Sequence, residues 1–306
     1  MSNAVELDHV SKIFGTYRAV DDLSLVVPVG SIYGFIGPNG SGKTTTLRMI
    51  TRIYAPDTGT VRVLGEAHHS ANDNRVGYLP EESGVYNTMK VGELLMFYAR
   101  LKGRHPKHEE LEDWLKRIEL PGVLGRRVQT LSKGQQQKIK FLAIAIGKPQ
   151  LLLLDEPFSG LDPVNAVVIR ELIQSLRANG TTIIFSTHDM RVAEELCDFI
   201  FMIYKGGKVL DGTLATIKAL YGQDVIRVRM PGAPDGAFDR LSGVAQVTDL
   251  GNVKELRLQA NADSQRVLSE LIARGPIEQF ERTSPSLQDI FVRIAAPDRS
   301  AMETMG

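Results

Sequence analysis

The chain has 306 residues, 43% hydrophobic and 24% charged, which allows one large and one smaller domain and is too apolar for a disordered protein. Lysine plus arginine and aspartate plus glutamate both number 36, so no overall basic charge favours nucleic acid or anionic lipid as a partner. The single cysteine, Cys197, excludes an intramolecular disulfide and fits a reducing cytosol. We expect neither a leader peptide nor a membrane-spanning helix, because no basic-then-apolar segment opens the sequence and its apolar runs are short.

The N-terminal part is predicted to be β-structure. Apolar clusters at 5–10 and 23–27 are typical of strands, and 59–65 alternates as another. The turn between the first two carries two aromatic residues, Phe14 and Tyr17. A flat ring in this turn could stack on a nucleotide base, and for Phe14 that hypothesis competes with packing in the core.

A glycine-rich loop, GPNGSGKT, joins a predicted strand at 31–36 to a predicted helix at 45–54. Glycines let consecutive backbone N–H groups turn onto phosphate oxygens, and the helix N-terminus adds positive potential. Lys43 is predicted to reach the β- and γ-phosphates and Thr44 to offer a hydroxyl to Mg²⁺. The predicted nucleotide-binding residues of this loop are Gly37, Pro38, Asn39, Gly40, Ser41, Gly42, Lys43, Thr44 and Thr45.

A helical region follows the next predicted strand, 75–79, which delivers Glu81 into a loop. The segments 91–102 and 109–119 each place apolar residues on one helical face. They are predicted to form a helical insertion in an otherwise α/β pattern.

A second glycine-bearing helix start lies at LSKGQ, residues 131–135, before a helix predicted at 136–146. Ser132 is the predicted N-cap, and the N-terminus presents unpaired N–H groups and a positive dipole end. Taken alone, this segment could be any capped helix.

Two predicted strands end in polar residues at the edge where open α/β sheets bind ligands. The strand 151–154 consists of four leucines and is followed by Asp155 and Glu156. Asp155 is suited to hold Mg²⁺ through its water shell, and Glu156 can face a water. The strand 181–186 delivers His188, which can donate to a developing phosphate charge but in isolation would also fit a structural histidine.

The motifs GPNGSGKT, LSKGQ, LLLLDEP, SGLD and STHD follow one another between Gly37 and Asp189. Together they resemble the nucleotide-binding domain of ABC transporters over roughly residues 5–213, and their joint occurrence makes the resemblance highly specific. It implies a P-loop NTPase fold of the α/β class. This ABC cassette has a mixed-sheet core, an antiparallel β-subdomain and a helical subdomain at about 83–147.

The resemblance also implies a catalytic role for each matching residue. Lys43 and Thr44 match the contacts to phosphate and Mg²⁺, and Asp155 matches the carboxylate in the second shell of the metal. Glu156 matches the general base that polarises the attacking water. His188 matches the switch histidine that contacts the γ-phosphate.

Further positions match contacts to the nucleotide. Phe14 matches the aromatic residue that stacks on adenine. Ser132, Gly134 and Gln135 match the signature that caps the γ-phosphate of ATP bound to the opposite subunit. The resemblance therefore implies two ATP molecules between two such domains, and a monomer is expected to hydrolyse ATP poorly.

Two positions depart from the family pattern. Lys133 stands in the signature where the family usually has glycine, and we expect little loss because its neighbours supply the donors. Glu81 stands where the family usually has a glutamine that touches Mg²⁺ and the attacking water. Glu81 is therefore predicted to bind the metal with Thr44 and Asp155, more tightly than an amide would but with a less well placed water.

The C-terminal region is predicted to be a small α+β domain. We expect an ATP-binding domain at 1–213, a linker helix at 214–222, an accessory domain at 223–296 and a tail at 297–306. The strand and helix pattern, with the closing stretch PSLQDIF, resembles the C-terminal domain of type-2 ABC exporters related to sodium and drug efflux systems.

These features predict an ATP-binding and hydrolysing subunit that energises an ABC transporter, expected to be an exporter, with ATP and Mg²⁺ as cofactors. Its expected partners are a second ATPase subunit, identical or related, and a membrane-spanning permease, with no nucleic acid. Its expected location is the cytoplasmic face of the cell membrane. The alternative is a soluble ABC ATPase that acts on DNA or ribosomes, but the long heptad runs or tandem cassettes of those families are missing. A P-loop kinase or GTPase would leave LSKGQ and SGLD unexplained.

Overall fold

The structure is a computed structural model, and it describes residues 2–67, 73–81, 88–221, 225–234, 236–259, 262–283, 285–292 and 294. The chain divides into two compact units, Met1–Thr213 and Leu214–Gly306. The predicted tail at 297–306 and the predicted start of the helical subdomain at 83 lie outside the described residues.

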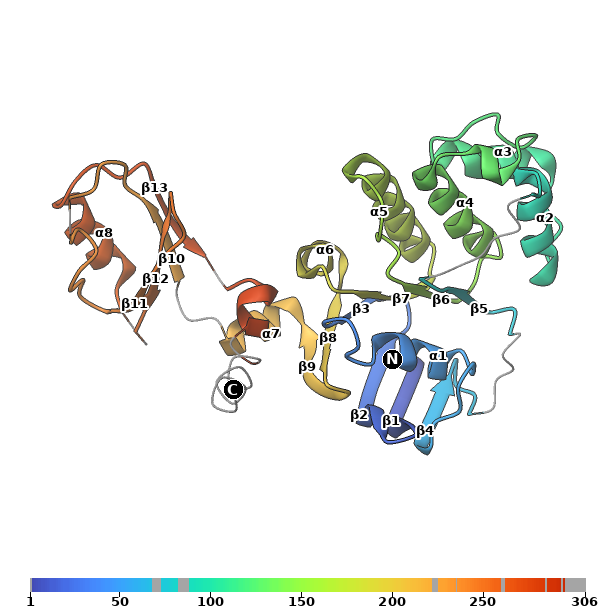
Figure 1. The fold of residues 1–306 in the computed structure, drawn as a ribbon, viewed down its shortest axis with the longest axis horizontal. Helices are drawn as coiled ribbons and strands as arrows, with labels where there is room; N and C mark the ends of the chain where they lie inside the picture. Colours follow the sequence, from blue (N-terminus) through green and yellow to red (C-terminus); the bar gives the residue numbers. More distant parts are fainter. Residues whose placement is uncertain are drawn as a thin grey trace. The chain divides into compact units, whose positions relative to one another are not determined.

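A six-stranded sheet forms the centre of the first unit, in the order β5-β6-β7-β3-β8-β9 (Figure 1). Every residue of β3, β6 and β7 is buried, as expected for parallel strands covered on both faces. All neighbouring pairs are parallel except β8 and β9. The strands are β3 (Ile32–Ile36), β5 (Val76–Leu79), β6 (Leu151–Asp155), β7 (Thr182–Thr187), β8 (Phe199–Tyr204) and β9 (Gly207–Thr213).

One face of this sheet is covered by helix α1 (Lys43–Ile50) and a three-stranded antiparallel sheet in the order β2-β1-β4. Its strands are β1 (Asn3–Phe14), β2 (Tyr17–Pro28) and β4 (Thr58–Val63). The predicted strands 5–10 and 23–27 were too short, because backbone pairing continues into exposed residues whose side chains carry no apolar pattern. The hairpin consequently turns at residues 15 and 16, with Phe14 paired to Tyr17.

The other face is covered by helices. Leu152 and Leu154 of β6 pack with them, while Leu151 and Leu153 pack on the side of the antiparallel sheet, so the strand alternates between two cores. Helix α4 begins three residues before the predicted start, because Ser132 caps it. The helices are α2 (Val91–Leu101), α3 (His108–Arg117), α4 (Lys133–Ala145), α5 (Pro163–Ala178) and α6 (Met190–Leu196), with a 3-10 turn at Val128–Thr130.

The second unit has a four-stranded antiparallel sheet in the order β11-β12-β10-β13. Helix α8 packs on one face of it through Val267 and Leu271. Residues 287–292 are also helical. The elements are α7 (Leu214–Tyr221), β10 (Val225–Arg229), β11 (Val244–Asp249), β12 (Lys254–Leu258), α8 (Ser264–Ile272) and β13 (Gln279–Thr283). Within the described part of the chain, no helix has the length and apolar character needed to cross a membrane.

Candidate functional site

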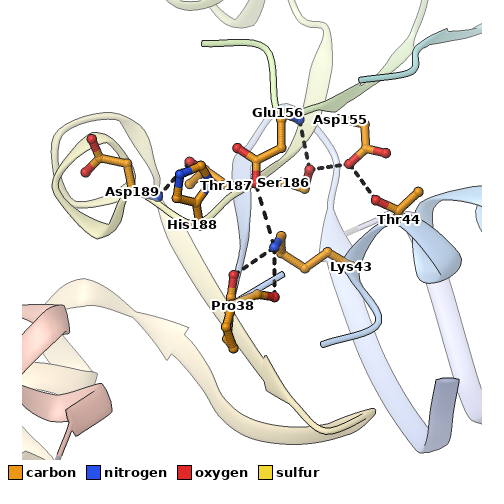
Figure 2. Close-up of polar contacts among 10 residues, drawn as sticks. Pro38, Lys43, Thr44, Asp155, Glu156, Ser186, Thr187, His188 and Asp189 are labelled. Carbon is orange, nitrogen blue, oxygen red and sulfur yellow. Dashed lines mark hydrogen bonds and ion pairs between the residues drawn. The ribbon is translucent and has the colours of Figure 1, made fainter. Parts of the chain in front are cut away.

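The carboxyl ends of β3, β7 and β6 lie side by side, and predicted site residues follow each of them (Figure 2). The three strands are parallel neighbours, and their register places Asp155 of β6 opposite Ser186 of β7. The glycine-rich loop follows β3, Glu156 follows β6 and His188 follows β7. The fold thus brings together three segments that are far apart in the sequence.

The glycine-rich loop needs glycine for two different reasons. Gly40 and Gly42 have φ angles of 76° and 110°, in the left-handed region that side chains disfavour. A Cβ atom on Gly42 would also lie 2.6 Å from the carbonyl oxygen of Ala19. Gly42 is the N-cap of α1, and no described side chain caps this helix. The N–H groups of its first turn therefore remain available to an anion.

Lys43 is buried at the centre of this loop, with 6% of its surface exposed. Its Nζ donates to the carbonyl oxygens of Gly37 and Pro38, at 2.7 and 3.2 Å, and lies 3.7 Å from Oε1 of Glu156. Burial lowers the pKa of the Lys43 ammonium, and the carboxylates of Glu156 and Asp155 oppose this shift. The ammonium is therefore held ready beside the loop, where a phosphate could replace its carbonyl partners.

Asp155 is almost completely buried and is held through one of its two oxygens. Oδ1 accepts hydrogen bonds from the Thr44 hydroxyl at 3.1 Å and from the Ser186 hydroxyl at 2.5 Å. Oδ2 is also buried, and no hydrogen-bond partner for it lies among the described residues. A buried carboxylate oxygen without a partner is costly, so this atom fits a contact to a hydrated cation.

Glu156 has an unusual backbone and a crowded side chain. Its φ is 49°, which is uncommon for a residue with a Cβ atom, and its N–H donates to the Ser186 hydroxyl at 3.0 Å. Oε1 lies 3.1 Å from Nδ1 of His188. Because the Glu156 side chain is 8% exposed and that of His188 is 60% exposed, the imidazole covers the carboxylate from the solvent side. Strained residues of this kind are typical of functional sites.

Ser186 is a site residue that the sequence analysis missed. Its hydroxyl donates to Asp155 and accepts from the Glu156 backbone, so it joins the two carboxylate residues. The available signal was its place as the first residue of STHD, directly before Thr187 and His188. A serine inside an apolar strand does not by itself indicate such a contact.

A cavity lies over the loop, and Tyr17 forms part of its wall. Glu81 and Glu156 line the same cavity, together with residues 39–45 and Ala19. Glu81 and Thr44 line the same cavity, and the binding of Mg²⁺ by Glu81 stays a prediction; residues 82–87 lie outside the described part of the chain. Among the described residues, no group of three His, Cys, Asp or Glu could hold a metal by themselves, so a Mg²⁺ ion here would also need hydroxyl and phosphate oxygens.

Phe14 lies across the hairpin turn from Tyr17, at the end of β1, and is 41% exposed. Its ring packs edge-on against Tyr54, with centroids 5.3 Å apart, and Nζ of Lys12 lies 5.6 Å from its centroid. The ring is thus held on the surface of the β-subdomain. Its stacking on adenine stays a prediction.

The signature residues lie at the N-terminus of α4, and among the described residues they are not part of the cavity wall. Ser132 and Gln135 form a reciprocal capping box: the Ser132 hydroxyl accepts from the Gln135 N–H at 3.3 Å, and Oε1 of Gln135 accepts from the Ser132 N–H at 3.1 Å. A Cβ atom on Gly134 would lie 2.8 Å from Nδ2 of Asn165. This helix start is therefore rigidly built but lies apart from the loop of its own chain.

Comparison with known proteins decides the family. A family model described as ABC transporter matches residues 20–159, and one described as the C-terminal domain of DrrA1-3-like ATP-binding proteins matches 212–295. An uncharacterised ABC transporter ATP-binding protein, YhaQ of Bacillus subtilis (strain 168), is 40% identical over 289 residues, which cover 94% of this chain and 96% of that protein. The chain belongs to the ABC transporter ATP-binding proteins.

Other relatives agree with this assignment. The Nod factor export ATP-binding protein I of Paraburkholderia xenovorans (strain LB400) is 34% identical over 297 residues, covering 95% of this chain and 96% of that protein. A solved structure of the ATP-binding subunit of an ABC transporter superposes with a TM-score of 0.65 at 28% identity, covering 71% of this chain and 93% of the other. The predicted family, fold class and ATPase activity are thereby confirmed, and the soluble alternative gains no support.

Replacing Ser186 by alanine should impair both the site and the fold of this ATP-binding protein. The change leaves buried Asp155 with one donor fewer and the Glu156 N–H without its acceptor, so we expect a loss of about 1–3 kcal/mol in the free energy of unfolding. Misplacement of Glu156 should lower turnover about tenfold. Urea unfolding and steady-state ATPase assays measure the two effects.

Ser31→Ala is the control, because Ser31 is also buried and donates to the Pro28 carbonyl at 2.7 Å, away from the site. It should cost stability without the loss of turnover. Equal turnover losses in both variants would show that Ser186 acts only through the fold.

Proposed function

We propose that this ATP-binding protein hydrolyses ATP at sites shared between two subunits. Closing of the subunit dimer on ATP binding and its opening after hydrolysis would drive a membrane-spanning permease. One observation carries the proposal. Thr44, Asp155, Ser186, Glu156 and His188 form a continuous line of polar contacts beside the Lys43 ammonium. A metal contact, a base and a phosphate donor are therefore available next to one phosphate loop.

Binding of ATP would begin with the loop. The N–H groups at the uncapped start of α1 would receive a phosphate, and Lys43 would exchange carbonyl contacts with Gly37 and Pro38 for phosphate oxygens. Phe14 would stack on the adenine. Thr44, Asp155 and Glu81 are the residues that would hold Mg²⁺, which neutralises phosphate charge when it is bound.

Hydrolysis would then use the residues after β6 and β7. Glu156 accepts a proton from the attacking water, and its left-handed backbone turns the carboxylate back over Lys43. His188, which now contacts Glu156 at 3.1 Å, is exposed enough to turn its ring to the γ-phosphate. The base is thus positioned by His188 and Lys43 before the nucleotide arrives.

Glu156→Gln should abolish turnover and retain ATP binding. An amide of the same size cannot accept the proton, so we expect kcat to fall by about 10²–10⁴-fold. Because ATP stays bound, the variant should accumulate as a dimer in gel filtration with MgATP. Exposed Glu109 of α3 supplies the control, since Glu109→Gln should leave kcat unchanged. Turnover near the wild-type rate in Glu156→Gln would remove this residue from the base role.

The position of the signature, residues 131–135, supports the proposal that a second subunit completes each ATP site. Ser132, Gly134 and Gln135 present a helix N-terminus with a hydroxyl, and this terminus is not part of the cavity wall over the described loop of its own chain. We infer that these residues contact the γ-phosphate bound by the partner.

Mixing two inactive variants tests this trans arrangement. Ser132→Asp keeps a good N-cap but brings a carboxylate to the γ-phosphate, and Lys43→Ala weakens binding in the loop. Each variant alone should be nearly inactive. A mixed dimer contains one intact site, so the mixture should recover up to about a quarter of wild-type activity in an ATPase assay. Activity equal to the sum of the separate variants would contradict completion by a second copy.

Glu81 is proposed to hold Mg²⁺ more tightly than glutamine would, at the expense of water placement. It lines the cavity with Thr44 and Glu156, and its charge acts on Lys43. Glu81→Gln removes one negative charge, so the half-saturating Mg²⁺ concentration should rise about three- to tenfold, while kcat at saturating Mg²⁺ should increase. Magnesium titrations of ATPase activity measure both. Unchanged values would show that Glu81 has no part in metal binding.

Export is the direction best supported by the relatives. Proteins named for Nod factor export are 32–34% identical over almost the whole chain, and the region 212–295 matches the DrrA1-3-like C-terminal domain. We infer that the permease holds the protein at the cytoplasmic face of the membrane. We infer a linker helix at 214–222 and an accessory domain at 223–296 that supports the dimer.

A further inference from the structure

Hydrogen bonds to its backbone carbonyl groups hold the phosphate loop in place. The carbonyls of Gly37 and Pro38 accept from Lys43, which is also the residue expected to contact phosphate. Two further loop carbonyls accept hydrogen bonds from residues outside the loop. The Tyr17 hydroxyl donates to the Gly40 carbonyl at 3.0 Å, and the Gly206 N–H donates to the Ser41 carbonyl at 2.9 Å. These two contacts can persist in the nucleotide-bound state.

The tip of the loop has little packing to hold it. Gly40 has a left-handed φ of 76°, and no described heavy atom lies within 4 Å of the place where its Cβ would be. At Gly42, by contrast, the Ala19 carbonyl is in close contact. The hydrogen bond from Tyr17 therefore restrains the part of the loop that packing leaves open.

A peptide group is planar, so holding its carbonyl also directs its N–H. The Gly40 carbonyl belongs to the same peptide as the Ser41 N–H, and the Ser41 carbonyl belongs to the same peptide as the Gly42 N–H. Tyr17 thus restrains the Gly40–Ser41 peptide, whose N–H donates to the Pro38 carbonyl at 3.2 Å, and Gly206 restrains the next peptide, Ser41–Gly42. Such preorganisation raises affinity because less ordering remains to be done on binding.

Tyr17 itself is held in place by the strand that it begins. It pairs with Phe14 across the hairpin, and farther along β2 the Asp21 N–H donates to the Gly206 carbonyl at 2.9 Å. The start of β2 and the turn between β8 and β9 therefore form one support for the loop. Tyr17 as a whole is 57% exposed, so its burial contributes little, and the hydrogen bond from its hydroxyl to the Gly40 carbonyl is its directional contact with the loop.

We propose that Tyr17 is a positioning residue for phosphate binding, which holds the loop tip in its receiving shape through the Gly40 carbonyl. This inference rests on the proposed ATP site. The two aromatic residues of the hairpin then have different roles. Phe14 stacks on the base, and Tyr17 positions the loop that binds the phosphates.

The test compares ADP with inorganic pyrophosphate, which has the phosphates without base or ribose. Dissociation constants for both, with Mg²⁺, are measured on the full chain by displacement of a fluorescent ADP analogue. Tyr17→Phe removes only the hydroxyl and should weaken both ligands by the same factor, about three- to tenfold. Phe14→Ala should weaken ADP alone. In ATPase assays, Tyr17→Phe should raise the KM for ATP by the same factor, with kcat within about twofold of wild type.

Tyr98→Phe in helix α2 is the matched control and should leave both dissociation constants unchanged. Unfolding temperatures of the variants show whether a weaker affinity reflects a damaged fold. An unchanged affinity of Tyr17→Phe for pyrophosphate would overturn the inference, whether or not ADP binding falls. Failure of the wild-type protein to bind either ligand would instead refute the proposed ATP site.

Discussion

The parallel pairing of β7 with both β6 and β3 is the constraint on which the site depends. Thr44 at the start of α1 and Asp155 at the end of β6 are 111 positions apart in the chain. They form a hydrogen bond only because β3, which leads through the loop to α1, and β6 end at one edge of the sheet. The same pairing brings the Thr187 carbonyl within 3.4 Å of the Gly37 N–H. Parallel strands cannot be joined by tight turns, so long connections separate these segments and the sheet alone brings them together.

The assembled site carries more negative than positive charge. Two buried carboxylates, Asp155 and Glu156, lie beside a single buried ammonium, and Glu81 adds a further negative charge to the cavity. A bound triphosphate would add to this negative charge, and a cation beside it would offset the excess. Among the described residues, no side chain caps the start of α1 and none bonds Oδ2 of Asp155. In the proposed site the helix start would receive the anion, and Oδ2 would contact the hydrated cation.

Two helix N-termini of the ATP-binding domain are capped in different ways. The first turn of α1 has no capping side chain within the described residues, whereas α4 is closed by the reciprocal bonds of Ser132 and Gln135. In the proposed arrangement, the N–H groups of α1 receive phosphate inside their own chain. The capped start of α4 would meet the partner, and a rigid surface loses less entropy on association.

Much of the core was predictable from local pattern. The strands 31–36, 151–154 and 181–186 were predicted within one residue of β3, β6 and β7, because fully buried strands have continuous apolar sequences. The hairpin of β1 and β2 was predicted too short, because its outer residues are exposed and paired only through the backbone. The order of the strands in the sheet could not be predicted from local sequence pattern, because that pattern does not specify which buried strands become neighbours.

The sequence by itself determined which residues follow which strands: a glycine-rich loop, carboxylates after a leucine strand and a histidine after the next strand. From these residue types it predicted the chemistry of the site. Tertiary structure alone decided how these groups are held. Ser186 joins Asp155 to Glu156, and Tyr17 braces the loop tip at Gly40. The physical reason is that such hydrogen bonds depend on distances across paired strands, which residue type and spacing along the chain do not specify.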